Sequence, residues 1–375
     1  MDSGHMMNRT FWIDLIRVVA ILLVIASHVC GRVAGGYAVE ECASALGWAG
    51  RLSVWINNAV WVVPVPLFVM VSGALLLGRN DTMGMFYRKR FGKILLPFLA
   101  WSGIFIFCLW IAGQSFRDGT PITLTSSIGA FLSGGISGHF WFMYMLVSLY
   151  LVTPFLSVFV RHASKTMLTG FIVLWFIAMV IFPVVQNIVQ ETFSIAGIAA
   201  DFHFELVSLW VGFFVAGYVL KDVLIPKHWA LIALVVGLCF SVAGPVNGYL
   251  LQVYPDSPVS FLLTIVGKYI LPLTSSQVTL TLIAFLVLRS LGDLPSLASS
   301  WVGRVVIATA PLTFGIYLSH HLLLTPAMKI LNLGGCGSWL VVLCVIPALT
   351  LLFYFATAAG IYVLRWNRYL RTLAP

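Results

Sequence analysis

The first apolar stretch of the chain, Phe11 to Val33, is the feature that most constrains the fold. It reads FWIDLIRVVAILLVIASHVCGRV, and a helix of about 20 apolar residues is long enough to cross the hydrocarbon core of a bilayer. The stretch nevertheless carries Asp14, Arg17 and His28. Ionisable side chains inside a membrane span are costly. They usually face the interior of a helix bundle or a wet cavity, where they mark functional sites.

The spacing of these three residues places them on one side of the predicted helix. At about 100° per residue, His28 returns to within about 20° of the face that carries Arg17, and Asp14 lies about 40° from His28. Arg17 and His28 are then separated by about 16 Å along the axis. The pattern predicts a polar seam through most of the membrane. The alternative is an Asp–Arg pair that snorkels to the cytoplasmic interface, with an unrelated histidine near the other end.

Composition assigns the whole chain to the membrane. Of its residues, 61% are hydrophobic and only 9% are charged, whereas a soluble domain carries about 25% charge. The formal charge of +9 is not a nucleic-acid signature, because in a membrane protein the position of each charge relative to the bilayer matters more. The cysteines show no metal-ligand spacing, and no metal is expected.

Hydropathy predicts an all-α, polytopic membrane protein with about ten transmembrane helices. The predicted spans cover residues 11–33, 53–78, 94–113, 140–160, 168–190, 205–220, 229–251, 262–288, 306–328 and 338–364. If the N-terminus is cytoplasmic, fifteen of the 21 Lys and Arg residues fall in inner segments and four, including Arg32, in outer ones. This bias predicts cytoplasmic N- and C-termini. Residues 1–6 are interpreted as an expression-tag remnant, and 7–375 as a single transmembrane domain.

The densest run of charge is FYRKRFGKILLPF, with Arg88, Lys89, Arg90 and Lys93 at the predicted cytoplasmic end of the third span. Such a cluster binds either anionic lipid headgroups at the membrane surface or the phosphates of a cytosolic nucleotide-bearing substrate. The spacing alone does not choose between the two.

Other spans hold weaker signals. In the second span, Ser72-Gly73 permits close backbone approach after two helix-breaking prolines. His139 and Trp141 stand at the predicted outer end of the fourth span, where Trp is also a common interfacial anchor. In the ninth span Tyr317 and His320 are three residues apart and therefore share one helix face.

Together these residues resemble the acyltransferase-3 family of integral-membrane acyltransferases, which includes bacterial sugar O-acetyltransferases. The specific part of the resemblance is Asp14-x-x-Arg17, followed after ten residues by His28. It continues in PLFVMVSG around Ser72, in FYRKRFGKILLP, in HFWFMYMLVSLYLVTP and in GIYLSH. The resemblance covers nearly all ten predicted spans.

The resemblance implies transfer of an acyl group, usually acetyl from cytosolic acetyl-CoA, to a hydroxyl acceptor at the outer side of the membrane. A sugar of a surface polysaccharide or of a lipid-linked glycan precursor is the usual acceptor, and the bacterial inner (plasma) membrane is the expected location. Arg17 and His28 are the implied essential residues, with the basic cluster as a contributor. The implied partners are the coenzyme A thioester, the acceptor and the bilayer, with no nucleic acid.

A mechanism consistent with both arguments makes His28 the general base that takes the proton of the acceptor hydroxyl, while Asp14 holds Arg17 in place. A covalent acyl-His28 intermediate is a variant of it. The predicted donor-binding set is Arg88, Lys89, Arg90, Lys93 and Ser72. The predicted acceptor-side set is Trp141, Tyr317 and His320.

The competing function is a transporter or flippase for an anionic or lipid-linked solute. Charged residues in spans, proline-broken helices and basic cytoplasmic ends are all common in transporters. Against this alternative, the sequence shows no paired internal repeat of the kind that many transporter folds contain.

Overall fold

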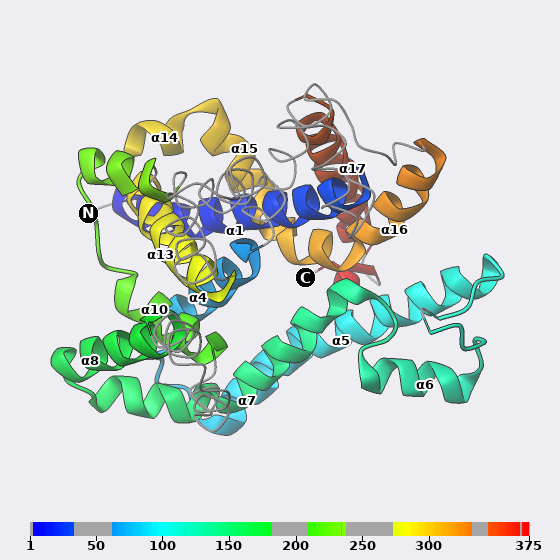
Figure 1. Cartoon of the computed structure of the whole chain (residues 1–375), viewed down its shortest axis with the longest axis horizontal. Coiled ribbons are helices and arrows are strands. Elements are labelled where there is room, and N and C mark those ends of the chain that lie inside the picture. Colours follow the sequence, from blue (N-terminus) through cyan, green and yellow to red (C-terminus); the bar gives the residue numbers. More distant parts are fainter. Residues whose placement is uncertain are drawn as a thin grey trace, which may run out of the picture. The chain divides into compact units, whose positions relative to one another are not determined.

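The computed structural model describes residues 3–33, 62–116, 118–181, 209–233, 235–237, 273–331, 344–367 and 370–374. Over these ranges the chain forms helices joined by turns and contains no β-strand (Figure 1). The all-α prediction is therefore confirmed for the part of the chain that the structure describes.

Five helical runs among the described residues are long and apolar enough to cross a membrane. They cover Phe11–Arg32, Met83–Ile111, Gly138–His162, Trp301–Leu331 and Ile346–Trp366. These helices support membrane character, whereas the count of ten spans and the cytoplasmic termini remain predictions. Of the predicted spans, the segments 53–61, 182–190, 205–208, 234, 238–251, 262–272 and 338–343 lie outside the described residues.

α5 (Met83–Ile111) and α6 (Leu124–Ser133) differ most clearly from the sequence prediction. α5 begins well before residue 94, because the Thr82 side chain caps it by accepting from the Met85 backbone N–H at 3.4 Å. The basic cluster therefore lies inside a helix. α6 was not predicted. A capping box between Thr123 and Ser126 starts it, and Gly134, with φ +77°, ends it.

The chain divides into two compact units. Unit 1 consists of Met1–Leu75, His162–Ala310 and Leu331–Leu351, and unit 2 of Leu76–Arg161, Pro311–Ile330 and Leu352–Pro375. Each unit is described by itself.

Unit 1 is built around α1 (Ser3–Val33), which packs against α13 (Leu273–Leu291), α14 (Pro295–Ser299) and α15 (Trp301–Thr309) (Figure 1). Trp12 of α1 meets Phe285 edge-on, with ring centroids 5.9 Å apart. The Arg289 guanidinium lies 5.0 Å from the Trp12 ring centroid, a cation–π contact. These contacts fix the rotation of α1 about its axis within unit 1.

The rest of unit 1 includes most of α4 (Pro64–Leu76), with α8 (Lys165–Phe176), η2 (Ile177–Ile181) and α10 (Leu209–Leu220). α4 and α10 approach so closely that their backbones touch at two glycines. A Cβ on Gly73 would overlap the Phe214 carbonyl group, and one on Gly217 would overlap the Met70 carbonyl group. The close approach predicted for Ser72-Gly73 is thus observed, and small residues permit it.

Unit 2 is built on α5 and α7 (Trp141–His162), which run side by side in opposite directions (Figure 1). The Tyr87 hydroxyl of α5 donates to the Leu151 carbonyl of α7 at 2.8 Å, one turn before Pro154, which lacks a backbone N–H. The unit also holds α6, η1 (Gly138–Phe140), α16 (Thr313–Leu331), most of α17 (Ile346–Trp366) and η7 (Leu370–Leu373).

Candidate active site

The three residues of the predicted polar seam lie at half-buried positions of α1. Asp14, Arg17 and His28 each keep part of their exposure, whereas Ile21, on the same side of the helix, is fully buried. Arg17 Nη1 lies 4.0 Å from Asp14 Oδ1, and the two side chains keep 36% and 27% of their exposure. The two charges therefore form a loose ion pair one helical turn apart.

Arg32 extends this seam. It lies four residues after His28, hence on the same face of α1, and it is also half-buried. The sequence analysis counted Arg32 with the outer segments, but α1 continues to Val33. A cation in the last turn of a helix is favoured by the helix dipole. The α1 seam therefore comprises Asp14, Arg17, His28 and Arg32.

The basic cluster occupies the first turns of α5 in unit 2. Arg88, Lys89 and Lys93 are exposed, and Arg90 is half-buried. Lys89 Nζ lies 3.0 Å from the Asp81 carboxylate. The hydrogen bond from Lys89, together with the nearby charges of Lys89, Arg79 and Arg90, holds the pKa of Asp81 below its usual range. Asp81 is therefore an ionised group surrounded by cations.

Ser72, the remaining member of the predicted donor set, lies on α4 in unit 1. Its hydroxyl donates to the Phe68 carbonyl at 2.8 Å, one turn back in the same helix. This is the usual arrangement for a serine within a helix. A role for Ser72 in donor binding stays a prediction.

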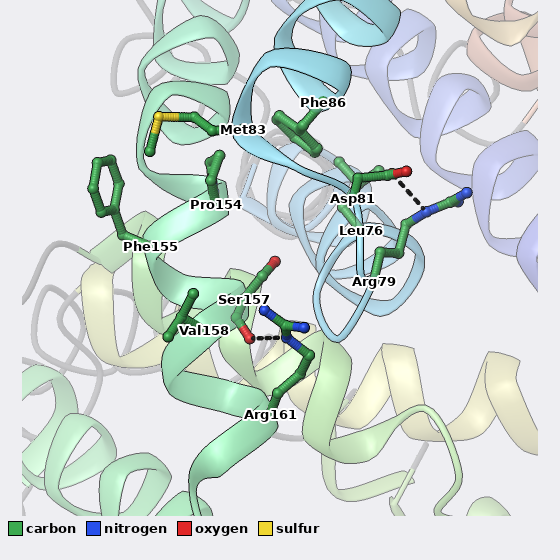
Figure 2. A pocket seen from close by; sticks show the side chains of 10 residues that line it. All are labelled: Leu76, Arg79, Asp81, Met83, Phe86, Pro154, Phe155, Ser157, Val158 and Arg161. Carbon is green, nitrogen blue, oxygen red and sulfur yellow. Dashed lines mark hydrogen bonds and ion pairs between the residues drawn. The ribbon is translucent and has the colours of Figure 1, made fainter.

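A cavity of about 280 Å³ opens beside the basic cluster, entirely within unit 2 (Figure 2). The turn between α4 and α5 and the first residues of α5 form one side, and the second half of α7 forms the other. Its lining residues are Leu76, Arg79, Asp81, Met83, Phe86, Pro154, Phe155, Ser157, Val158 and Arg161. We call this the α5–α7 cavity.

Two arginines bring positive charge to the α5–α7 cavity, one on each side. Arg79 Nε lies 3.3 Å from the Asp81 carboxylate. Arg161 donates from Nε to the Ser157 carbonyl at 3.3 Å and from Nη1 to the Asn80 side-chain oxygen (Figure 2 draws the first of these). Arg79 and Arg161 are far apart in the chain and belong to no motif, so the sequence did not single them out as site residues.

A second polar cluster in unit 2 holds three imidazole rings. His139, in η1 just before α7, stacks on His321 of α16, with ring centroids 4.4 Å apart and planes 9° apart. His320 lies 4.9 Å from the His139 ring and 4.8 Å from the His321 ring. His320 is fully buried and His139 is 4% exposed. The structure thus brings His320 together with His139, at the start of the predicted fourth span, and with His321. His321 was not among the residues singled out from the sequence.

Hydrogen bonds to carbonyl groups define the tautomers in this imidazole cluster. A carbonyl only accepts, so His320 Nδ1, 2.7 Å from the Tyr317 carbonyl oxygen, carries the proton. When the His320 ring is neutral, its lone pair is therefore on Nε2. His139 has the opposite tautomer. Its Nε2 faces the Leu318 carbonyl at 3.5 Å, and its Nδ1 accepts from the Ser137 hydroxyl at 2.8 Å.

The other predicted acceptor-side residues differ in their surroundings. The Tyr317 hydroxyl donates to the His139 carbonyl, and the ring is 4% exposed, so this side chain fixes the start of α7 against α16. Trp141 is 45% exposed. Their roles at an acceptor remain predictions.

One comparison with known proteins gives a match that covers most of the chain. A family model described as an acyltransferase domain, that of the acyltransferase-3 family, matches residues 10–359. No curated protein and no solved structure matches the sequence significantly. The matched region includes the α1 seam, the basic cluster, the α5–α7 cavity and the imidazole cluster. Because the match spans nearly the whole chain, this apolar protein, which is helical over its described ranges, belongs to the acyltransferase-3 family of membrane acyltransferases.

Proposed function

We propose that this acyltransferase moves an acetyl group from cytosolic acetyl-CoA to a hydroxyl group at the outer side of the bacterial inner membrane. The acceptor class is a sugar of a surface polysaccharide or of its lipid-linked precursor. The α1 seam is the observation that carries the proposal. A single continuous helix bears Arg17 and His28 on one side, both half-buried and about 16 Å apart along the axis.

His28 is the general base of the proposed reaction. Its imidazole takes the proton from the acceptor hydroxyl while the oxygen attacks the thioester carbonyl carbon. The new C–O bond forms, the C–S bond breaks, and coenzyme A leaves as a thiolate that takes up a proton. A histidine suits this role because its ordinary pKa is near neutrality. Asp14, within ion-pair range of Arg17, orients the guanidinium.

The basic cluster on α5 supplies the attraction for the donor. Coenzyme A carries an adenosine diphosphate head with an additional 3′-phosphate, and charge-assisted hydrogen bonds from Lys and Arg hold such groups. Arg88 and Lys93 are exposed and therefore accessible to a soluble anion. The helical start of α5 places Arg88 and Lys93 within about two turns of each other.

The imidazole cluster is the proposed acceptor side in unit 2. Because Nδ1 of His320 donates to the Tyr317 carbonyl, Nε2 is the accepting nitrogen of the neutral ring, and a hydroxyl group is a suitable donor to such an atom. Trp141 is exposed near the same end of α7 and offers a flat apolar face, which suits the C–H face of a sugar ring. Tyr317 acts through His139 and is a positioning residue.

The test separates donor binding from transfer. His28→Ala is compared with wild type and with His228→Ala, a matched control at an exposed position. Donor binding is measured as thermal stabilisation of the purified protein by coenzyme A. Transfer is measured as incorporation of label from radioactive acetyl-CoA into the envelope glycans of membranes that contain each variant.

We expect His28→Ala to keep donor binding and to lose at least about 100-fold in transfer, the scale of general-base catalysis. His228→Ala should behave like wild type. Transfer at the wild-type rate in His28→Ala would show that His28 is not the general base. Arg88→Ala combined with Arg90→Ala should weaken coenzyme A binding, and an unchanged affinity would remove the cluster from the donor site.

A further inference from the structure

We infer that the α5–α7 cavity is the subsite for the 3′-phosphoadenosine end of the donor, with Arg161 and Arg79 as its phosphate ligands. This inference rests on the proposed function, because it assumes a coenzyme A thioester as the donor. It adds residues that belong neither to the α1 seam nor to the basic cluster.

The size of the cavity indicates which part of a donor it holds. About 280 Å³ is just below the range of about 300 to 1,000 Å³ that is typical of pockets for whole small ligands. Coenzyme A as a whole does not fit. A single end of the molecule, a nucleoside with one phosphate, is of the appropriate size.

The charge of the cavity favours a phosphate. Asp81 lies between Arg79 and Lys89, at 3.3 and 3.0 Å, and offsets only part of their positive charge. Arg161 is different. Among the residues that the structure describes, it bonds to two neutral oxygens, the Ser157 carbonyl and the Asn80 amide, and to no carboxylate. The guanidinium of Arg161 therefore keeps its full charge at the edge of the cavity.

Arg161 is also held in position. Two hydrogen bonds, one to its own helix (Figure 2) and one to the turn before α5, fix its planar group. Fixing the side chain in advance lowers the entropy lost on binding. A planar guanidinium with donors still available on Nη2 matches the paired oxygens of a phosphate.

The remaining wall of the cavity is apolar and suits the nucleoside of the 3′-phosphoadenosine end. Phe86 is buried, at 3% exposed, and Pro154 is half-buried, whereas Phe155 keeps 62% of its exposure. An exposed aromatic ring at the edge of a cavity offers a stacking surface for a purine. In Figure 2, Phe155, Pro154 and Met83 lie on the side of the cavity away from Arg79.

The same chemistry would also suit a lipid phosphate, so the experiment separates the two sources. Full-length protein is reconstituted in nanodiscs of phosphatidylcholine alone or with phosphatidylglycerol. Binding of coenzyme A and of 3′-dephospho-coenzyme A is then measured by calorimetry. The variants are Arg161→Gln and Arg79→Gln, and Arg304→Gln is the matched control, because it is an exposed arginine outside all the sites described.

In wild type we expect coenzyme A to bind at least about tenfold more tightly than the dephospho form, since the 3′-phosphate adds a charge-assisted contact. Arg161→Gln and Arg79→Gln should bring this ratio towards one, while Arg304→Gln keeps it. Arg88→Gln should weaken both ligands and leave the ratio unchanged. Arg161→Lys keeps the positive charge but lacks the planar guanidinium, so it should give an intermediate ratio. An intermediate ratio would also show that the loss in Arg161→Gln does not come from misfolding.

Three outcomes would overturn the inference. A wild-type affinity ratio near one, or a ratio that both arginine variants leave unchanged, would show that the cavity does not bind the 3′-phosphate. Coenzyme A binding that phosphatidylglycerol weakens in wild type but not in Arg161→Gln, with an unchanged ratio, assigns the cavity to lipid. Failure of wild type to bind either coenzyme A form would instead contradict the proposed function itself.

Discussion

The close contact between α4 and α10 gives a quantitative prediction for unit 1. Gly73 and Gly217 face the partner helix at two places, so each can be replaced by alanine separately or together. A Cβ on Gly73 would lie 2.7 Å from the Phe214 carbonyl carbon, and one on Gly217 would lie 2.6 Å from the Met70 Cα. Because carbon atoms in contact are normally about 3.5–4.0 Å apart, and the Phe214 and Met70 carbonyl oxygens lie closer still to the added Cβ atoms, either substitution forces the helices apart by at least about 1 Å.

The expected cost follows from overpacking. Inserting a methyl group into a well-packed contact costs about 1–3 kcal/mol, and the better helix propensity of alanine returns about 0.5–1 kcal/mol. Each single variant should therefore lose about 1–2 kcal/mol of stability. Once the helices have separated for one methyl group, the second fits at little further cost. The double variant should consequently lose much less than the sum of the two single losses.

Thermal unfolding of the purified protein in detergent measures these effects. The apparent melting temperature should fall by about 2–5 °C for each single variant and by a similar amount for the double variant. Gly103→Ala in α5 is the matched control, since an added Cβ there meets no atom of the described residues within 4 Å. Full additivity, or melting temperatures equal to that of Gly103→Ala, would refute the contact.

Three further predictions concern single side chains of unit 2. Tyr317→Phe should lower stability by about 1–3 kcal/mol, because it removes the hydroxyl that bonds the buried His139 carbonyl; Tyr362→Phe, at a 53% exposed position, should leave the melting temperature unchanged. Asp81→Asn should tighten coenzyme A binding, because Arg79 and Lys89 then no longer pair with a carboxylate. The pKa of Asp81 is lowered, so Asp81 stays ionised until the pH falls through that lowered value. Calorimetry should therefore find the same gain in affinity of the variant over wild type from about pH 5 to 8. Thr123→Ala should cost about 1 kcal/mol and speed hydrogen exchange within α6, because it removes the capping box.

The sequence predicted the long helices well, because apolar length alone determines them. The predicted span 11–33 agrees closely with the apolar run Phe11–Arg32 of α1. The predicted spans at 140–160 and 306–328 lie inside the helical runs Gly138–His162 and Trp301–Leu331. The start of α5 was placed too late, since Arg88 and its neighbours lowered the local hydropathy without ending the helix. The cap at Thr82, a local signal, marks the real start.

The candidate sites were predictable only in part. The seam on α1 follows from one helix and its period, so the positions of Arg17 and His28 could be read from spacing. The α5–α7 cavity could not, because Arg161 and Asn80 are 81 residues apart and meet only through the packing of two helices. The same holds for the stacked rings of His139 and His321, which come from separate helices.

The direction of α5 and α7 allows one decisive test of the proposed donor side. The two helices are antiparallel, so the start of α5 and the end of α7 share one end of unit 2, where the cavity lies. The Lys/Arg bias predicts that this end is cytosolic, and α6 with Ser133 follows the opposite end of α5.

Gly84→Cys and Ser133→Cys, both at exposed positions, are introduced into a background without other cysteines. A membrane-impermeant thiol reagent added to spheroplasts should label Ser133→Cys at once, and Gly84→Cys only after permeabilisation. The reverse pattern would place the cavity where no acetyl-CoA is supplied, and both the cluster and the cavity would then be excluded as donor sites.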